Sequence, residues 1–202
     1  MKGQQQALSA ILITAVLIGV VGSVYFWGLP LIQKSKDISV LGGCESFMMN
    51  LNNKIKDTAN HGGSDSIEIT VPGTLKFDGA NLTLYVDTAG IIYDVNALIP
   101  LSRNDCSSPE GTWGIDNPEV LCIWTECLGS GKCEKYHTEY KLHYLTLNVA
   151  VESSMKAYKI ELIGNQDYGG EHRYVKMENK GTTEEMVDGR TLISTKIGIS
   201  II

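Results

Sequence analysis

The most reactive side chains in this sequence belong to five cysteines. Cys44 stands apart, and the other four fall within 28 residues of one another, at Cys106, Cys122, Cys127 and Cys133. No two of them have the Cys-x-x-Cys spacing, so thioredoxin-like redox chemistry and covalent haem attachment have no support. All five come after a long apolar stretch, which places them in one part of the chain.

Two kinds of chemistry remain open for this group, a zinc site and disulfide bonds. Cys122 and Cys127 are separated by four residues and His137 comes after Cys133, which is at the loose end of zinc-site spacings. Disulfides are the favoured interpretation for a domain outside the cytosol. We expect the cysteines between 106 and 133 to pair among themselves, in an order left open, and Cys44 to be unpaired. No metal site is predicted.

Other patterns with catalytic associations are incomplete. Ser153 to Lys156 spells Ser-x-x-Lys, but the partner motifs of penicillin-binding enzymes do not occur in the sequence. Gly131-Lys132 lacks the rest of a phosphate-binding loop. Asp167 and Glu171 lie in a glycine-rich turn, and the four histidines have no paired metal-ligand spacing. We therefore expect no enzymatic activity and no cofactor.

The element that must position everything else is the apolar stretch at the start. From Gln4 to Gln33 the sequence has no charged residue, and Leu, Ile, Val and Ala occupy every angle around a helix axis. A helix that is apolar all round requires lipid or a packed protein interior, and about 20 such residues suffice to cross a bilayer. Pro30 should kink or loosen this helix between residues 26 and 30. The stretch predicts a membrane-inserted helix at residues 4–36.

A basic residue and a glycine precede this helix directly. An ordinary secretory signal would instead have small residues after its apolar part. Lys2-Gly3 followed by Gln4 and the uncharged run resembles the class III signal peptide of archaeal type IV pilins and archaellins. That resemblance implies a leader at residues 1–3, cut after Gly3 by a prepilin peptidase. The sequence departs from bacterial pilins at Leu8, where they carry a glutamate.

In the family that this start resembles, the retained helices pack at the centre of a filament. The chain would then be a structural subunit that self-assembles into an extracellular type IV pilus-like filament, inserted in the membrane before assembly. A plain membrane anchor carrying an extracellular binding domain, or a minor archaellum-associated component, are the alternatives. Ala15, Gly19 and Ser23 form a row of small residues that would let helices approach closely.

Charge bears on the location and partners of the rest of the chain. Lys2 is the only basic residue before the apolar run, which favours a cytoplasmic start and a cell-surface location for the residues beyond the run, although Lys34 and Lys36 weaken the bias. From Lys34 onward there are 16 basic and 23 acidic residues. The acidic residues are scattered and no basic stripe occurs, so nucleic acid is not an expected partner.

Residues 37–65 are expected to be a stalk-to-head transition. Phe47, Met48, Leu51 and Ile55 recur at helical spacing, which predicts a helix over about 44–57. The glycine pairs at 42–43 and 62–63 are expected to mark its two ends. Continuity of helix between residues 33 and 43 is left open.

From residue 66 to 202 the apolar residues alternate with a period of two, which predicts short β-strands. Residues 90–101 predict one or two strands, residues 140–152 predict one long strand, and Asn179-Lys180-Gly181 predicts a turn between two of the last strands. Asn81 begins the sequon Asn-Leu-Thr and is a glycosylation candidate if it is exposed and exported. The predicted class is α+β, a long N-terminal apolar helix followed by an all-β extracellular head with disulfides. The family resemblance implies an immunoglobulin-like sandwich for that head.

Overall fold

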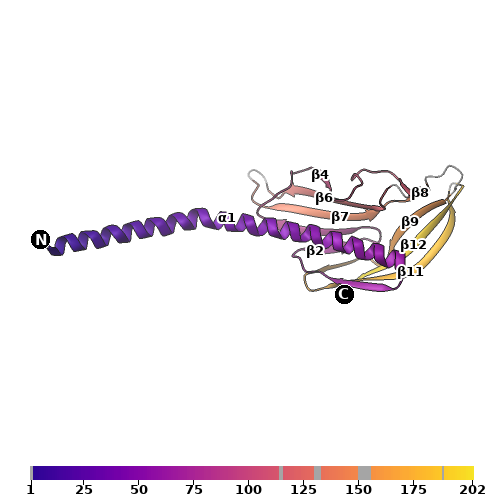
Figure 1. Cartoon of the computed structure of the whole chain (residues 1–202), viewed down its shortest axis with the longest axis horizontal. Coiled ribbons are helices and arrows are strands. Elements are labelled where there is room, and N and C mark those ends of the chain that lie inside the picture. Colours follow the sequence, from indigo (N-terminus) through magenta and orange to yellow (C-terminus); the bar gives the residue numbers. More distant parts are fainter. Residues whose placement is uncertain (1, 114–115, 130–132, 150–155, 188) are drawn as a thin grey trace.

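The computed structural model describes residues 2–113, 116–129, 133–149, 156–187 and 189–202. A single helix, α1 (Lys2–His61), begins the chain and carries a β-rich head at its far end. The first half of α1 projects away from the head, and its second half lies along the strands (Figure 1). The structure therefore has the predicted coarse plan, one long apolar helix followed by a β-sheet domain with two disulfides.

The helix is longer than the sequence predicted. Gly42 and Gly43 do not interrupt it, so the separate helix expected over 44–57 is the continuation of α1. Burial explains why, because Leu41 and Cys44, on either side of the glycines, are both fully buried in the head. Packing of this kind outweighs the cost of about 1 kcal/mol for a glycine inside a helix.

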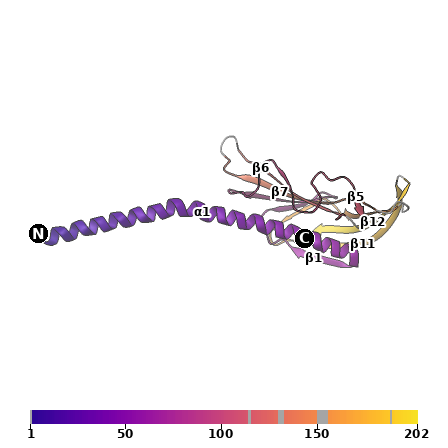
Figure 2. The ribbon, with the colours of Figure 1, turned by 45° about the horizontal axis from the view of Figure 1, so that its top comes forward.

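Pro30 bends the helix without ending it. The helix continues through this residue, although proline cannot donate to the carbonyl four residues earlier. A gentle bend near the middle of α1 is visible in Figure 2. The helix ends where predicted, at Gly62 and Gly63, whose φ angles of 76° and 84° are left-handed.

Twelve strands are present in the described residues, and they form two six-stranded sheets. The first has the order β1-β11-β12-β9-β8-β5 and the second β10-β2-β3-β7-β6-β4. Pairing is antiparallel except between β12 and β9 and between β5 and β8. The two sheets are separate and do not close on each other. The strands are β1 (Ser64–Glu68), β2 (Thr74–Phe77), β3 (Leu82–Thr88), β4 (Leu98–Pro100), β5 (Gly111–Trp113), β6 (Glu119–Cys127), β7 (Tyr136–Tyr144), β8 (Leu147–Val149), β9 (Lys156–Ile163), β10 (Asp167–Gly170), β11 (Tyr174–Val187) and β12 (Arg190–Ile201).

Two strand predictions need correction, and a third needs a narrower range. Residues 140–152 do not form one strand: β7 ends at Tyr144 and β8 starts at Leu147, while residues 150–152 lie outside the described part. Residues 90–101 contain one strand, as predicted, but it is short: only Leu98–Pro100 pairs, as β4. The Asn179-Lys180-Gly181 sequence is not a turn between strands but an irregularity within β11, where the register with β12 shifts.

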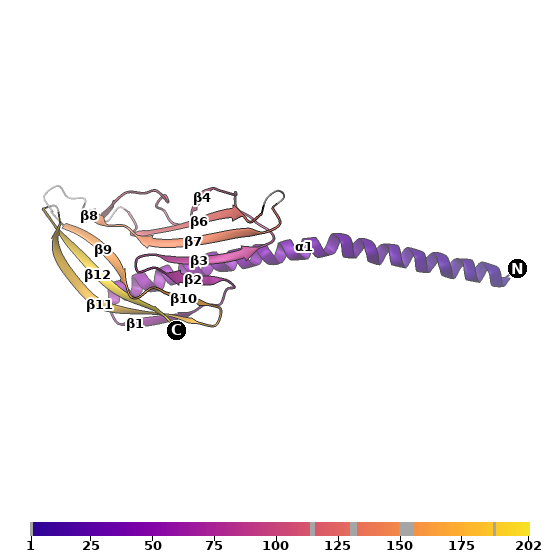
Figure 3. The same cartoon turned by 180° about the vertical axis from the view of Figure 1, so that it is seen from behind.

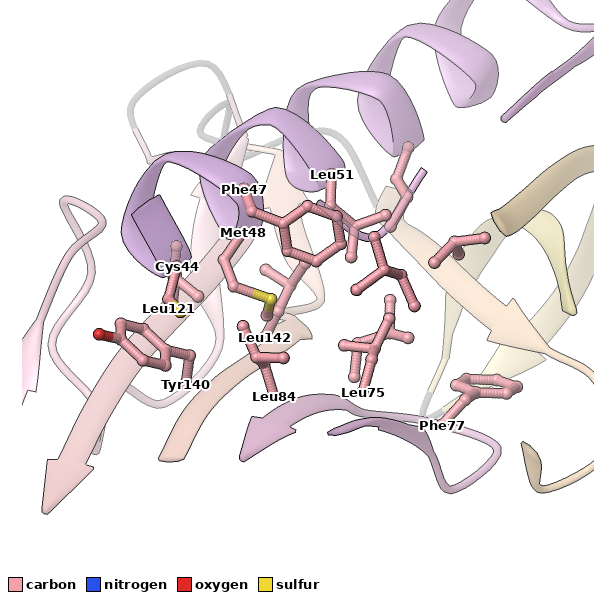
Figure 4. Close-up of a cluster of buried hydrophobic side chains, with 14 of the residues drawn as sticks. Cys44, Phe47, Met48, Leu51, Leu75, Phe77, Leu84, Leu121, Tyr140 and Leu142 are labelled. Atoms are coloured by element: carbon pink, nitrogen blue, oxygen red, sulfur yellow. The ribbon is translucent and has the colours of Figure 1, made fainter. Parts of the chain in front are cut away.

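The second half of α1 is the core element of the head, and it includes the apolar residues of the stretch 37–65 that the sequence analysis described as a stalk-to-head transition. The helix contacts β1, β11 and β12 of one sheet and β3 and β7 of the other, and Figure 3 shows the strands from the side opposite the helix. In Figure 4, helix side chains point toward side chains of the strands. The buried apolar residues of the helix are Leu41, Cys44, Phe47, Met48, Leu51 and Ile55, and they share one cluster with Leu75, Leu84, Leu121, Tyr140 and Leu142.

Candidate functional site

The residues of the predicted cleavage site, Lys2, Gly3 and Gln4, begin α1 and have helical backbone. Met1 lies outside the described residues, and so do the side chains of residues 2–8. The cleavage site therefore remains a prediction.

Beyond it lies the projecting segment, which we define as residues 9–36 of α1. Its apolar side chains are exposed, and the exposed fractions of Phe26 and Trp27 are 85% and 79%. The helix is long and apolar enough to cross a membrane, with a mean hydropathy of 2.2 in a window none of which is buried. Fifteen large hydrophobic residues of this segment are exposed: Ile11, Leu12, Ile13, Val16, Leu17, Ile18, Val20, Val21, Val24, Tyr25, Phe26, Trp27, Leu29, Leu31 and Ile32.

Two hydroxyl groups of the projecting segment are satisfied within the helix itself. Thr14 Oγ1 donates to the carbonyl of Ala10 and Ser23 Oγ to that of Gly19, both at 2.8 Å. Unpaired polar groups are costly in an apolar environment, and back-bonding to the helix removes that cost. The Gly19 surface is also open, with no atom within 4 Å of where a Cβ would lie. The segment is thus suited to an apolar environment on all sides.

Where the helix enters the head, a buried carboxylate holds it to a loop. Asp37 Oδ2 accepts from the backbone N–H of Gly90 at 2.6 Å, and Asp37 Oδ1 accepts from Gln33 Nε2 at 3.1 Å. A Cβ on Gly90 would lie 3.1 Å from the Asp37 carboxylate, so any larger residue here would crowd this contact. A charged hydrogen bond of this type is stronger than a neutral one.

One helical turn further, two tyrosines hold the helix. The Tyr140 hydroxyl donates to the Leu41 carbonyl at 3.1 Å and lies 3.1 Å from the Tyr93 hydroxyl, which donates to Glu45. Burial is the main cause that raises the pKa of both tyrosines, so both hydroxyls remain protonated donors at neutral pH. Burial also raises the pKa of the neighbouring Cys44 thiol to about 12.

Toward the end of the helix, polar side chains of both sheets continue these contacts. Tyr144 donates to Asn52 Oδ1 at 2.9 Å, and Lys56 pairs with Glu119 at 3.1 Å. The Asn179 side chain, in the β11 irregularity, donates to the carbonyl of Thr58 at 3.0 Å. These contacts fix the helix in the head along its whole second half, and the direction of the projecting segment is set by them.

The cysteines form two local disulfides. Cys106 is bonded to Cys122 and Cys127 to Cys133, and Cys44 is a buried free thiol. Cys122 and Cys127 belong to different disulfides, so they do not share a metal ion. Within the described residues, no group of three potential ligands could hold a metal.

The remaining sequence candidates are dispersed. Asn81 is half-buried just before β3, and its Nδ2 donates to Asp78 Oδ2 at 2.9 Å. Asp167 accepts from the backbone of Ile201 at 3.1 Å, which is a structural contact. Ser153 and the Gly131-Lys132 pair lie outside the described residues.

Sequence reasoning missed Asp37, Tyr93 and Tyr140, whose contacts join residues about 50 to 100 positions apart. The only local signal was Asp37 itself, the first acidic residue after the apolar run.

The fold and these contacts define a class of protein: a long uncovered apolar helix rooted in the core of a disulfide-braced β head. Comparison of the chain with protein-family models, with curated proteins and with solved structures finds no match in any of the three.

Proposed function

We propose that this chain is a structural subunit of an extracellular type IV pilus-like filament of the archaeal kind. The observation that carries the proposal is the projecting segment, whose fifteen large apolar side chains are uncovered in the single chain. Burying one such side chain contributes about 1.5–3 kcal/mol, so the segment strongly favours any state that covers it.

Two environments can cover the segment. A bilayer covers it before assembly, and the same segment of neighbouring subunits covers it in a filament. Contacts between copies that do not close into a ring produce open helical polymers. Because α1 continues into the head core, packing the segments together would place every head on the outside in a fixed orientation.

The disulfides support a location outside the cell. Disulfides persist in oxidising compartments, and the head has two among its described residues. Together with the apolar helix this suggests that the head is extracellular and that the projecting segment is the anchor or the assembly element. The heads would then carry adhesion, glycans at Asn81 or other surface contacts, and the head is proposed to belong to the immunoglobulin-like group.

The Lys2-Gly3 pair directly before the uncharged apolar run supports the filament over a plain anchor. A prepilin peptidase would cut after Gly3 and leave Gln4 as the new N-terminus. The alternatives are a single-pass anchored extracellular binding domain, which would keep Lys2, and a minor archaellum-associated component, which would be cut but not form the bulk of a fibre.

The test is intact mass and N-terminal sequencing of protein sheared from the surface of cells that produce the chain. Chains beginning at Gln4 in sedimentable fibres are the expected result. A Gly3→Leu variant should remain uncut and absent from fibres, whereas the matched Lys2→Arg variant, which keeps the basic residue, should be cut. Native chains that retain Lys2 and are found only in detergent-soluble membranes would refute the filament proposal and leave the anchored domain.

A further inference from the structure

A cavity of about 540 Å³ opens on the surface of the head, on the face of β4, β6 and β7 that points away from α1. Ligand sites commonly have volumes of about 300–1,000 Å³. No part of the proposed filament function uses this cavity. Its lining residues are Asn96, Leu98, Cys106, Cys122, Trp124, Glu139, Lys141 and His143.

Strand register brings these side chains together. Trp124 of β6 lies opposite Glu139 of β7 and opposite Leu98 of β4, so the three form one row across the sheet. In the next row, Cys122 lies opposite Lys141. Side chains that are directly opposite have Cβ atoms about 4.5–5.5 Å apart, so each row forms a continuous surface.

The alternation of the strands separates this face from the core. Ile123 and Tyr140, the pair between the two rows, are fully buried against the helix. Cys106 and Cys122 belong to a second, smaller apolar cluster with Val120, Leu145 and Leu147. The lining residues therefore lie outside the main core that α1 forms with the strands. They are free to contact a ligand without disturbing the packing of α1.

Two features hold the walls in place. The Cys106–Cys122 disulfide ties the segment before β5 to the outer face of β6. On the other side, the backbone N–H of Asn96 donates to the Thr125 carbonyl at 2.7 Å. Asn96 has a left-handed φ of 61°, a conformation that asparagine adopts more readily than most residues.

The polar groups of the cavity suit a ligand that both donates and accepts hydrogen bonds. Glu139 accepts, Lys141 donates, and the side chains of Asn96 and neutral His143 can each do both. Nδ1 of His143 is buried and has no hydrogen-bond partner among the described residues. Burial, with a smaller contribution from Lys141, lowers the pKa of His143, which keeps it neutral at pH 7.

The charges of the cavity nearly cancel. A carboxylate at Glu139 and an ammonium at Lys141 belong to neighbouring rows of the same strand. The two opposite charges offset each other, so the cavity has no net electrostatic preference for an anionic or a cationic ligand. Trp124 adds a large apolar ring beside these polar groups.

From this combination we infer that the cavity is a binding site for a neutral saccharide, with one sugar ring packed on Trp124 and its hydroxyls bonded to Glu139, Lys141 and His143. The C–H face of a pyranose is apolar and matches an aromatic ring, and sugar hydroxyls are both donors and acceptors. This inference does not rest on filament assembly, because the site would be equally open on a membrane-anchored monomer.

The experiment uses the full chain in non-ionic detergent that contains no sugar headgroup. Cellobiose, chitobiose and mannobiose are titrated as neutral probes, with glucuronic acid and glucosamine as charged probes, and binding is followed by NMR shifts of the tryptophan indole and histidine ring signals. We expect at least one neutral probe to shift the signals of Trp124 and His143 and to bind more tightly than the charged probes.

Variants locate the site. Trp124→Ala should weaken binding of that probe about tenfold or more, and Glu139→Gln should weaken it with little change in fold. Trp113→Ala is the matched control, because Trp113 is 47% exposed and stacks on Tyr158, away from the cavity. If Trp124→Ala fails to fold, the inference is tested by the loss of binding in Glu139→Gln and by the shifts of the Trp124 and His143 signals in the parent chain. Absence of any shift at 10 mM of every neutral probe, preference for a charged probe, or equal loss in Trp113→Ala would overturn the inference.

Discussion

Two leucines on α1 test whether its second half forms the core of the head while its first half lies outside the head. Leu51 is fully buried in the head, whereas Leu17 is 58% exposed in the projecting segment. Leu51→Ala removes three buried carbons, worth about 2.4 kcal/mol at about 0.8 kcal/mol each, and the cavity left behind brings typical losses to about 3–5 kcal/mol. Leu17→Ala removes the same atoms without any contact in the head. We expect it to change head stability by less than about 0.5 kcal/mol.

The assay is thermal unfolding of the full chain in detergent micelles with the disulfides intact, followed by the strand signal in circular dichroism. In a chain of this size 1 kcal/mol shifts the midpoint by about 2–4 °C, so a loss of about 3–5 kcal/mol in Leu51→Ala should lower the midpoint by about 6–20 °C. Leu17→Ala should leave the midpoint unchanged but reduce fibre yield in cells. A Leu51→Ala midpoint within about 2 °C of the parent would refute the conclusion that α1 forms the core of the head.

Three further predictions concern single residues. Gly42→Ala should raise the free energy of unfolding by about 0.5–1 kcal/mol in the same assay, because the position is helical with no atom within 4 Å of the new Cβ. Gly90→Ala should lower the free energy of unfolding, because its Cβ crowds Asp37. Cys44 should resist iodoacetamide at pH 8 in the native chain and react after denaturation, since its pKa is about 12 and the side chain is buried; mass spectrometry that finds native labelling would contradict this. His143 should titrate below the ordinary value of 6.5 in NMR. As the pH falls, His143 is protonated in the unfolded chain before it is protonated in the folded chain. The free energy of unfolding should therefore decrease below about pH 6.5, and His143→Gln should make that decrease smaller.

Local features of the chain were predictable because their physical cause is local. The apolar composition of residues 4–33 predicts an uncovered helix without reference to any other residue. Alternation in residues 81–86 predicts a strand, and β3 (Leu82–Thr88) covers most of that stretch. The two disulfides each close a short loop within the cysteine group that the sequence indicated.

Features that depend on contacts between distant residues were not predictable. Gly42-Gly43 reads locally as a helix end, yet the helix continues because both sheets bury the residues around it. Asn179-Lys180-Gly181 reads as a turn, yet β11 continues past it and Asn179 bonds the end of α1.

The sequence alone determined that an apolar helix leads into a β-rich, disulfide-containing head, since hydropathy and period are properties of neighbouring residues. Only the tertiary structure decided that the second half of the helix is the core of that head. It also decided which cysteines pair and that Trp124, Glu139 and His143 line one cavity. Strand register and the packing of α1 join residues far apart in the chain, and no local pattern in the sequence specifies those pairings.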